Sequence, residues 1–134
     1  MEDFVNFSIA KKLKEKEFPQ RPDYFNYSSY YDWDGLRKIH SLSNASVWFD
    51  PNISRDNLYF APTISQTLKW LRDKKELHIE IYMYHNYYLW EIYNTKIYDV
   101  DFIQKREKYS EIEYATYEQA TLAGIEYVLD NLIG

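Results

Sequence analysis

The sequence contains no cysteine and very little glycine, and each shortage excludes particular kinds of functional site. Without thiols the chain has no disulfide framework, no thiolate metal site and no cysteine nucleophile. The glycines are three isolated residues, Gly35, Gly124 and Gly134. They cannot form a P-loop, a dinucleotide-binding glycine run or a serine nucleophile elbow. We therefore expect no cofactor and no nucleotide-dependent enzyme of a familiar type.

Long apolar runs are also missing. The N-terminal segment MEDFVNFSIAKKLKEKEF lacks the apolar stretch of a signal peptide, and no other segment approaches the length of a membrane span. We expect a cytoplasmic protein without membrane contact. The net charge is −5, from 21 acidic and 16 basic residues. This balance argues against nonspecific binding to nucleic acid, although it does not exclude a local basic patch.

Tyrosine is the residue in excess. Aromatic residues make up 19% of the chain, and 15 of its 134 residues are tyrosines. A tyrosine combines a large apolar ring with a polar tip, so it suits half-buried sheet faces and contact surfaces. With 46% hydrophobic residues the chain can build a packed core, and its length predicts a single domain over residues 1–134.

The stretch 61–92 predicts a helix followed by a hairpin. Thr63 and Gln66 fit a capping box that opens the helix. The reversal is expected at His85-Asn86, between a strand at 77–84 and a partner strand at 87–93. Two apolar patterns define the buried faces, one of helical period with Ile64, Leu68 and Leu71, and one of period two with Leu77, Ile79, Ile81 and Met83.

Two further helices are predicted near the ends of the chain. The first covers residues 4–17, with Asn6 or Ser8 as its cap. The second is opened by a capping box from Thr116 to Gln119, and Gly124 within it suggests close approach to a neighbouring element. The expected core face of this second helix consists of Tyr117, Ala120, Thr121, Gly124, Ile125, Val128, Leu129 and Leu132.

The other segments are less regular. Residues 24–31 predict an edge strand, and residues 36–40 predict a strand that returns beside it. A third strand is expected at 96–100, followed by a loop with some helical turns over 101–113. These elements together predict an α+β domain, with an antiparallel sheet of about three to five strands and helices packed on one face.

Several segments carry a resemblance to other proteins. They are FSIAKKLKEKEFP near the N-terminus, APTISQTLKWLRDKKELHIEIYMY in the centre and YATYEQATLAGIEYVLDNLI at the C-terminus. In these segments the chain resembles a group of small proteins encoded in Bacteroidetes genomes and in their phages or integrated elements. The resemblance implies a mobile-element origin. It implies no activity and no functional residues, because none is assigned to that group.

The few clusters of ionisable residues do not predict a metal site or a catalytic site. His78 and Glu80 point to the same side of one strand, but His85 falls on the opposite side by the period-two count. A catalytic zinc site needs three protein ligands. Asp32 and Asp34 flank a tryptophan in a turn-like sequence, without the apolar surroundings that adapt a carboxylate to acid–base catalysis.

Three functions from different classes are compatible with the sequence. The first is a non-catalytic protein-interaction module that binds a protein partner or a second copy of itself. The second is a nucleic-acid-binding module, because helix–strand–strand–strand–helix is also the order of a double-stranded-RNA-binding domain. A small hydrolytic or metal-dependent enzyme ranks third. The predicted contact surface of the first consists of Tyr24, Tyr27, Tyr30, Tyr31, Trp33, Tyr82 and Tyr84.

Overall fold

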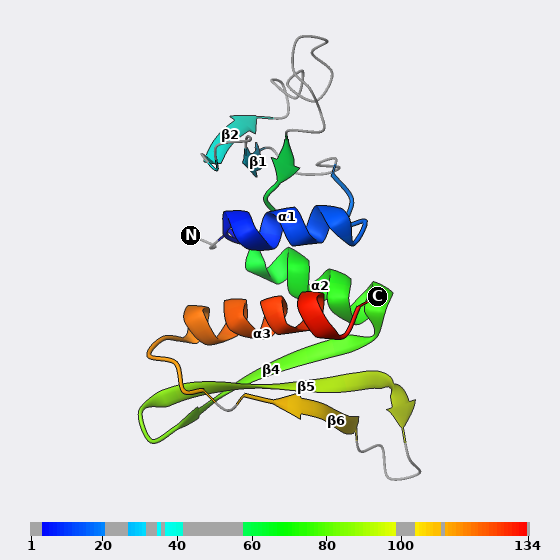
Figure 1. The fold of residues 1–134 in the computed structure, drawn as a ribbon, viewed down its shortest axis with the longest axis vertical. Helices are drawn as coiled ribbons and strands as arrows, with labels where there is room; N and C mark the ends of the chain where they lie inside the picture. The colour runs from blue at the N-terminus through cyan, green and yellow to red at the C-terminus, as the bar shows by residue number, and fades with distance from the viewer. Residues whose placement is uncertain are drawn as a thin grey trace. The chain divides into compact units, whose positions relative to one another are not determined.

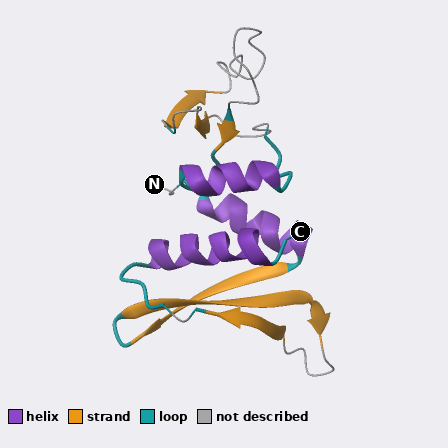
Figure 2. Ribbon diagram, in the orientation of Figure 1, coloured by secondary structure: helices purple, strands orange, loops and turns teal. Residues whose placement is uncertain are grey.

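The computed structural model describes residues 4–20, 27–31, 35, 37–41, 58–98, 104–110 and 112–133. The chain divides into two compact units, unit 1 with residues 1–63 and unit 2 with residues 64–134. Helices and antiparallel strands occur in both, so the predicted α+β class is confirmed (Figure 1) (Figure 2). The sequence predicts one sheet, whereas the described strands form two sheets of three strands each. The single domain over residues 1–134 stays a prediction.

Unit 1 contains helix α1, Phe7–Glu15. Asn6 caps this helix, because the backbone N–H of Ile9 donates to Asn6 Oδ1 at 2.9 Å. The bond satisfies one of the donors that a helix start leaves open, and it confirms Asn6, rather than Ser8, as the cap. The helix buries three apolar residues, Ile9, Ala10 and Leu13.

The sheet of unit 1 consists of β1, Tyr27–Tyr31, β2, Arg37–Ser41, and β3, Tyr59–Phe60. The predicted return of the chain from β1 to β2 is confirmed, because the two strands pair antiparallel. The order of the sheet is β2-β1-β3, so β1 is its central strand and the expectation of an edge strand is wrong. Local pattern could not show this, because β3 comes from far along the chain.

Unit 2 begins with helix α2, Ile64–Lys75. The helix starts directly after Thr63, as predicted, but the capping box itself stays a prediction. The helix buries Thr67 and Leu71, whereas Ile64 and Leu68 are only partly covered. The predicted stripe is therefore wrong in part. The side of the helix that faces inward carries Thr67 and Leu71, which are four positions apart.

The helix is followed by the predicted hairpin, with β4 at Leu77–Tyr84 and β5 at Tyr87–Tyr98. The reversal at His85 and Asn86 is confirmed. Both residues have positive φ, 51° and 74°, as a two-residue hairpin turn of type I′ requires.

The third strand of this sheet, β6, is Gln104–Tyr109, and the order is β4-β5-β6. The predicted strand at 96–100 is wrong, because residues 96–98 belong to β5. The predicted loop at 101–113 is also wrong, since it contains β6. The sequence of β6 is QKREKY, which has no apolar alternation. It becomes a strand because β5 offers a paired edge, which a local pattern does not reveal.

Helix α3, Tyr117–Asn131, completes unit 2. Thr116 is its cap as predicted, and its Oγ1 accepts from the backbone N–H of Gln119 at 3.1 Å. The two end positions of the expected core face, Tyr117 and Leu132, are exposed, so the prediction is wrong there. The residues between them that were expected to be buried are so, namely Ala120, Thr121, Gly124, Ile125, Val128 and Leu129.

Helix α3 lies close against the sheet at Gly124. A Cβ at this position would lie 3.1 Å from Ile79 Cγ2 and 3.3 Å from Trp90 Cγ. The predicted close approach is confirmed. Helix α2 contacts both β4 and α3, and the two helices lie on the same side of the sheet (Figure 1). The core of unit 2 therefore lies between these helices and the first half of the hairpin.

Candidate interaction surface

The turn of the β4–β5 hairpin places large side chains in pairs. Tyr84 lies opposite Tyr87, and Met83 lies opposite Tyr88. Side chains of successive residues point to opposite faces of a sheet, so the two pairs lie on different faces. Met83 and Tyr88 lie on the side of the helices, because they share a face with Trp90, which contacts α3.

Ser110 and Tyr114 attach their part of the chain to the same end of the hairpin. The backbone N–H of Tyr88 donates to the carbonyl of Tyr114 at 2.7 Å, and the N–H of Tyr114 donates back at 2.9 Å. The backbone N–H of Ser110 donates to the carbonyl of Trp90 at 2.9 Å, and the Oγ of Ser110 accepts from the N–H of Trp90 at 3.1 Å. The ring of Tyr117, the first residue of α3, meets the ring of Tyr88 edge-on at 6.2 Å between centroids. Three segments of unit 2 therefore meet at one place.

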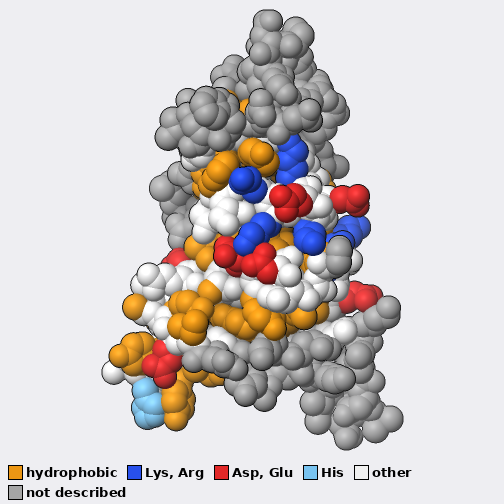
Figure 3. Space-filling view, in the orientation of Figure 1, with side chains coloured by type: hydrophobic (Ala, Val, Ile, Leu, Met, Phe, Trp, Pro, Cys, Tyr) orange, Lys and Arg blue, Asp and Glu red, His pale blue; other side chains and the backbone are white. Residues whose placement is uncertain are grey.

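This place is where exposed apolar side chains gather in the part of the chain that the structure describes. We call it the apolar end, and Figure 3 shows hydrophobic side chains gathered there, at the turn of the hairpin. Elsewhere among the described residues, Leu132 at the other end of α3 is the large hydrophobic side chain that is exposed. The exposed fractions in the apolar end are 64% for Met83, 55% for Tyr84, 47% for Tyr87, 64% for Ile112 and 48% for Tyr117.

The charged residues next in the chain to the apolar end are acidic. The sequence has no Lys or Arg in residues 76–95 or in residues 109–134, so all 16 basic residues lie elsewhere. Glu113 and Glu118, which are next in the chain to members of the apolar end, are exposed. A negative potential is therefore expected around the apolar side chains, and it attracts a basic surface and repels phosphate.

The face of the hairpin that points away from the helices carries His78 and Glu80, the ionisable pair considered from the sequence. His78 Nε2 lies 3.0 Å from Glu80 Oε2 on the same strand, and Tyr93 donates a hydrogen bond to Glu91 on the partner strand. Glu80 and Glu91 lie directly opposite each other on the two strands. Each carboxylate has a neighbour on its own strand, which is His78 for Glu80 and Tyr93 for Glu91. Among the described residues no three His, Asp or Glu side chains are placed to hold a metal ion together.

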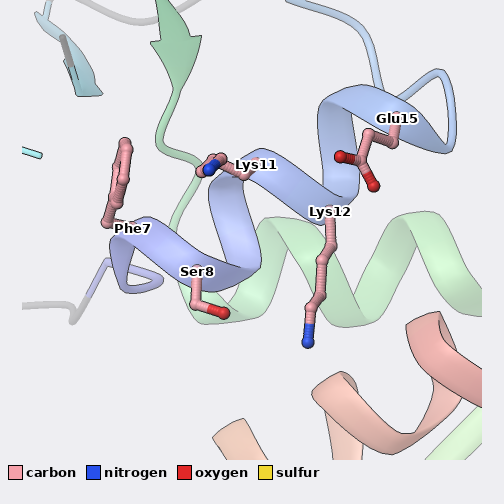
Figure 4. Close-up of a pocket in the computed structure, with 5 residues that line it drawn as sticks. All are labelled: Phe7, Ser8, Lys11, Lys12 and Glu15. Carbon is pink, nitrogen blue, oxygen red and sulfur yellow. The ribbon is translucent and has the colours of Figure 1, made fainter. Parts of the chain in front are cut away.

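A hollow of about 290 Å³ lies on helix α1 in unit 1. Its lining residues in the described part of the chain are Phe7, Ser8, Lys11, Lys12 and Glu15, and all come from that one helix. Figure 4 shows that these side chains spread apart instead of converging on a point. The Lys11 ammonium lies 5.3 Å from the centroid of the Phe7 ring. The hollow does not bring together an acid and a base, and we assign it no chemistry.

The structure does not gather the seven predicted surface residues in one described cluster. Tyr24 and Trp33 lie outside the described residues, and only the backbone of Tyr27 is described. Tyr30 is buried, and the half-buried Tyr31 donates its hydroxyl to the carbonyl of Val5 at 2.6 Å. In unit 2, Tyr82 is half-buried on β4. Tyr84, two residues further along the same face, belongs to the apolar end.

Sequence reasoning missed the other four members of the apolar end. Met83 was expected in the core, because it continues the alternation of β4. Tyr117 was expected on the core face of α3. One signal was available, namely that the two longest segments without Lys or Arg, residues 76–95 and 109–134, contain all five members.

Comparison of the chain with protein-family models, with curated proteins and with solved structures finds no match in any of the three. Across the described residues, no helix combines the length and the apolar character that crossing a membrane requires.

Proposed function

We propose that this chain is a non-catalytic protein-interaction module, and that the apolar end of unit 2 binds its protein partner. The observation that carries this proposal is the concentration of exposed apolar side chains from three segments at one place. Burying exposed apolar surface against a partner is favourable by about 25 cal/mol per Å². Tyrosine and methionine are among the residues enriched in protein interfaces.

The charge around the apolar end favours one kind of partner. Glu113 and Glu118 would lie at the rim of the interface, where charges select partners and speed association. The complementary surface has an apolar centre surrounded by Lys or Arg.

From the resemblance alone, we also propose a mobile-element origin. A cytoplasmic location likewise remains a proposal.

Nucleic-acid binding is the second candidate, and one observation favours it. The order α2-β4-β5-β6-α3 matches that of a double-stranded-RNA-binding domain, although this is an analogy of fold alone. Helix α2 also exposes Lys69, Arg72 and Lys74. Against it, the complete absence of Lys and Arg from α3 and from the β4–β5 turn leaves much of unit 2 unable to neutralise phosphates.

Two matched triple variants separate these candidates. The first replaces Tyr84, Tyr87 and Ile112 by serine and removes most of the apolar end. The second replaces Lys69, Arg72 and Lys74 by serine and removes the exposed cations of α2. Each variant, and the parent, is recovered by a tag from cells of the natural host, and the protein and nucleic acid that accompany it are quantified.

The protein-interaction proposal expects a defined protein partner with the parent, a loss of at least tenfold in its recovery with the first variant, and unchanged recovery with the second. Nucleic acid recovered with the parent in a salt-sensitive manner, and lost with the second variant, would instead establish the second candidate. Equal recovery of the same protein with all three chains would show that the apolar end does not bind it. Thermal unfolding of the three chains checks that the variants are folded.

A further inference from the structure

Among the described strands, β4 has a partner on one edge only. In the sheet order β4-β5-β6, β4 pairs with β5 on one side, and no other described strand pairs with it on the other side (Figure 1). An open edge presents backbone N–H and C=O groups that can bind another strand. Proteins commonly block such edges with lysine, proline or irregular pairing.

The two edge strands of this sheet differ in that protection. The six-residue strand β6 includes Lys105, Arg106 and Lys108, and its pairing with β5 contains register shifts. The eight-residue strand β4, LHIEIYMY, contains neither lysine nor proline, and it pairs with β5 without a shift. Lysines and an irregular pairing, which hinder strand addition, are therefore present on one edge of the sheet and missing from the other.

The hairpin register identifies the backbone groups that face the open edge. The N–H groups of Tyr88 and Trp90 donate to segment 110–116 at 2.7 and 3.1 Å, so the backbone of both residues faces away from β4. Opposite residues in such a pair both face outward, and Met83 and Ile81 are their opposites. Because the direction alternates along a strand, the residues of β4 that face the open edge are Leu77, Ile79, Ile81 and Met83.

We propose that β4 pairs antiparallel with β4 of a second copy of this chain, around a twofold axis at Ile81. Only odd-numbered residues face the edge, so a twofold axis must pass through a residue and not between two residues. Of the allowed positions, an axis at Glu80 or at Ile81 pairs the largest number of β4 residues between the two copies. An axis at Glu80 would place two carboxylates directly opposite each other, which is destabilising. An axis at Ile81 avoids this contact.

The pairing at Ile81 also gives each side chain a suitable neighbour. Ile81 lies beside Ile81 of the second copy, and Met83, which is 64% exposed in one chain, lies beside Ile79. Glu80 lies beside Tyr82, whose hydroxyl can donate to a carboxylate. The result is one continuous sheet across two chains. This inference concerns the edge of β4 and does not rest on the proposed role of the apolar end.

Single cysteine variants test the register directly, because the parent has no cysteine and any disulfide must join two copies. Paired residues with the axis at Ile81 have Cα atoms about 5.5 Å apart, inside the range that a disulfide spans. The Cα atoms of the two Glu80 residues would then be roughly 8 Å apart, because they are offset by two residues along neighbouring strands, and this lies outside that range. Mild oxidation should therefore convert Ile81→Cys to a covalent dimer and leave Glu80→Cys largely monomeric. Faster linkage of Glu80→Cys would overturn the proposed register.

Sedimentation of the parent and of two Met83 variants tests the dimer itself. The parent should sediment as a species with twice the 16.4 kDa mass of the single chain. Met83→Pro removes an N–H that faces the edge but no bond of the β4–β5 pair, so it should sediment as a monomer. Met83→Ala keeps that N–H and should remain a dimer. A parent that is monomeric at high micromolar concentration overturns the proposal. So does a folded Met83→Pro that dimerises like the parent. Circular dichroism confirms that the proline variant is folded.

Discussion

The two halves of the β4–β5 hairpin have the same sequence alternation and opposite surroundings. In the half next to α2, Leu77 and Ile79 are 7% and 6% exposed, and Ile92 is completely buried. In the half next to the turn, Met83 continues the same alternation and is exposed. The alternation therefore defines which face of the strand is apolar. It does not define how far along the strand that face is covered.

The difference arises from the position at which α3 covers the sheet. The helix packs closely at Gly124, over Ile79 and Trp90, and its buried residues begin at Ala120. Its first residue, Tyr117, meets the sheet through an edge-on contact of its ring with the ring of Tyr88. Beyond that contact the apolar face has no described cover. The stability of unit 2 is thus expected to depend on one half of the hairpin, and its binding on the other.

Ile92→Ala should have the largest effect on stability. Ile92 is completely buried in the covered half, so its truncation removes apolar contacts and leaves a cavity. We expect a loss of about 2–5 kcal/mol in the free energy of unfolding. Chemical denaturation measures this loss, with the slope compared to that of the parent. A loss below about 1 kcal/mol would mean that this half of the hairpin is not the core.

Gly124→Ala should destabilise by less. Alanine favours a helix by about 0.5–1 kcal/mol over glycine, but its methyl would meet Ile79 and Trp90 at 3.1 and 3.3 Å. Overpacking costs about 1–3 kcal/mol, so the net change should be a loss. Gly124→Leu should be worse, because the clash grows and the propensity hardly changes. An alanine variant more stable than the parent would show that α3 does not press on the sheet here.

Thr116→Ala removes the cap of α3 and should cost about 1 kcal/mol. The hydroxyl accepts from the Gln119 N–H at 3.1 Å, and alanine leaves that donor to water. Thr116→Ser keeps the hydroxyl and serves as the control, with a change of only a few tenths of a kcal/mol expected. Thermal unfolding of the three chains checks the prediction, which fails if serine and alanine are equally destabilising.

Ile112→Ser should have the smallest effect on stability and a clear effect on binding. Ile112 is 64% exposed and lies outside the helices and strands, so we expect a change within about 0.5 kcal/mol. Recovery of the protein partner should fall nevertheless. A stability loss comparable with that of Ile92→Ala would contradict the division of the hairpin and its neighbours into a core and a contact surface.

The sequence predicted the local features of the fold well. The caps Asn6 and Thr116, the turn at His85-Asn86 and the close approach at Gly124 each follow from the chemistry of a few neighbouring residues. Strand β6 could not be predicted in this way, because its charged sequence pairs only when β5 provides an edge. The central position of β1 likewise depends on a distant strand.

The candidate surface was less predictable for a related reason. Whether Met83 or Tyr117 is exposed depends on the positions at which α3 begins and the hairpin turns, which are tertiary features. Tyr84, one member of the predicted contact surface, is exposed. The contact itself stays a prediction.

Site-specific photocrosslinking tests the central claim most directly. A benzophenone amino acid replaces Tyr87 in the apolar end or, as the control, the exposed Lys69 on α2, and both chains are irradiated in cells of the natural host. The account predicts a discrete crosslinked protein from position 87, lost when Ile112→Ser and Tyr84→Ser are added, and no such product from position 69. Equal products from both positions, or none from position 87, would contradict it.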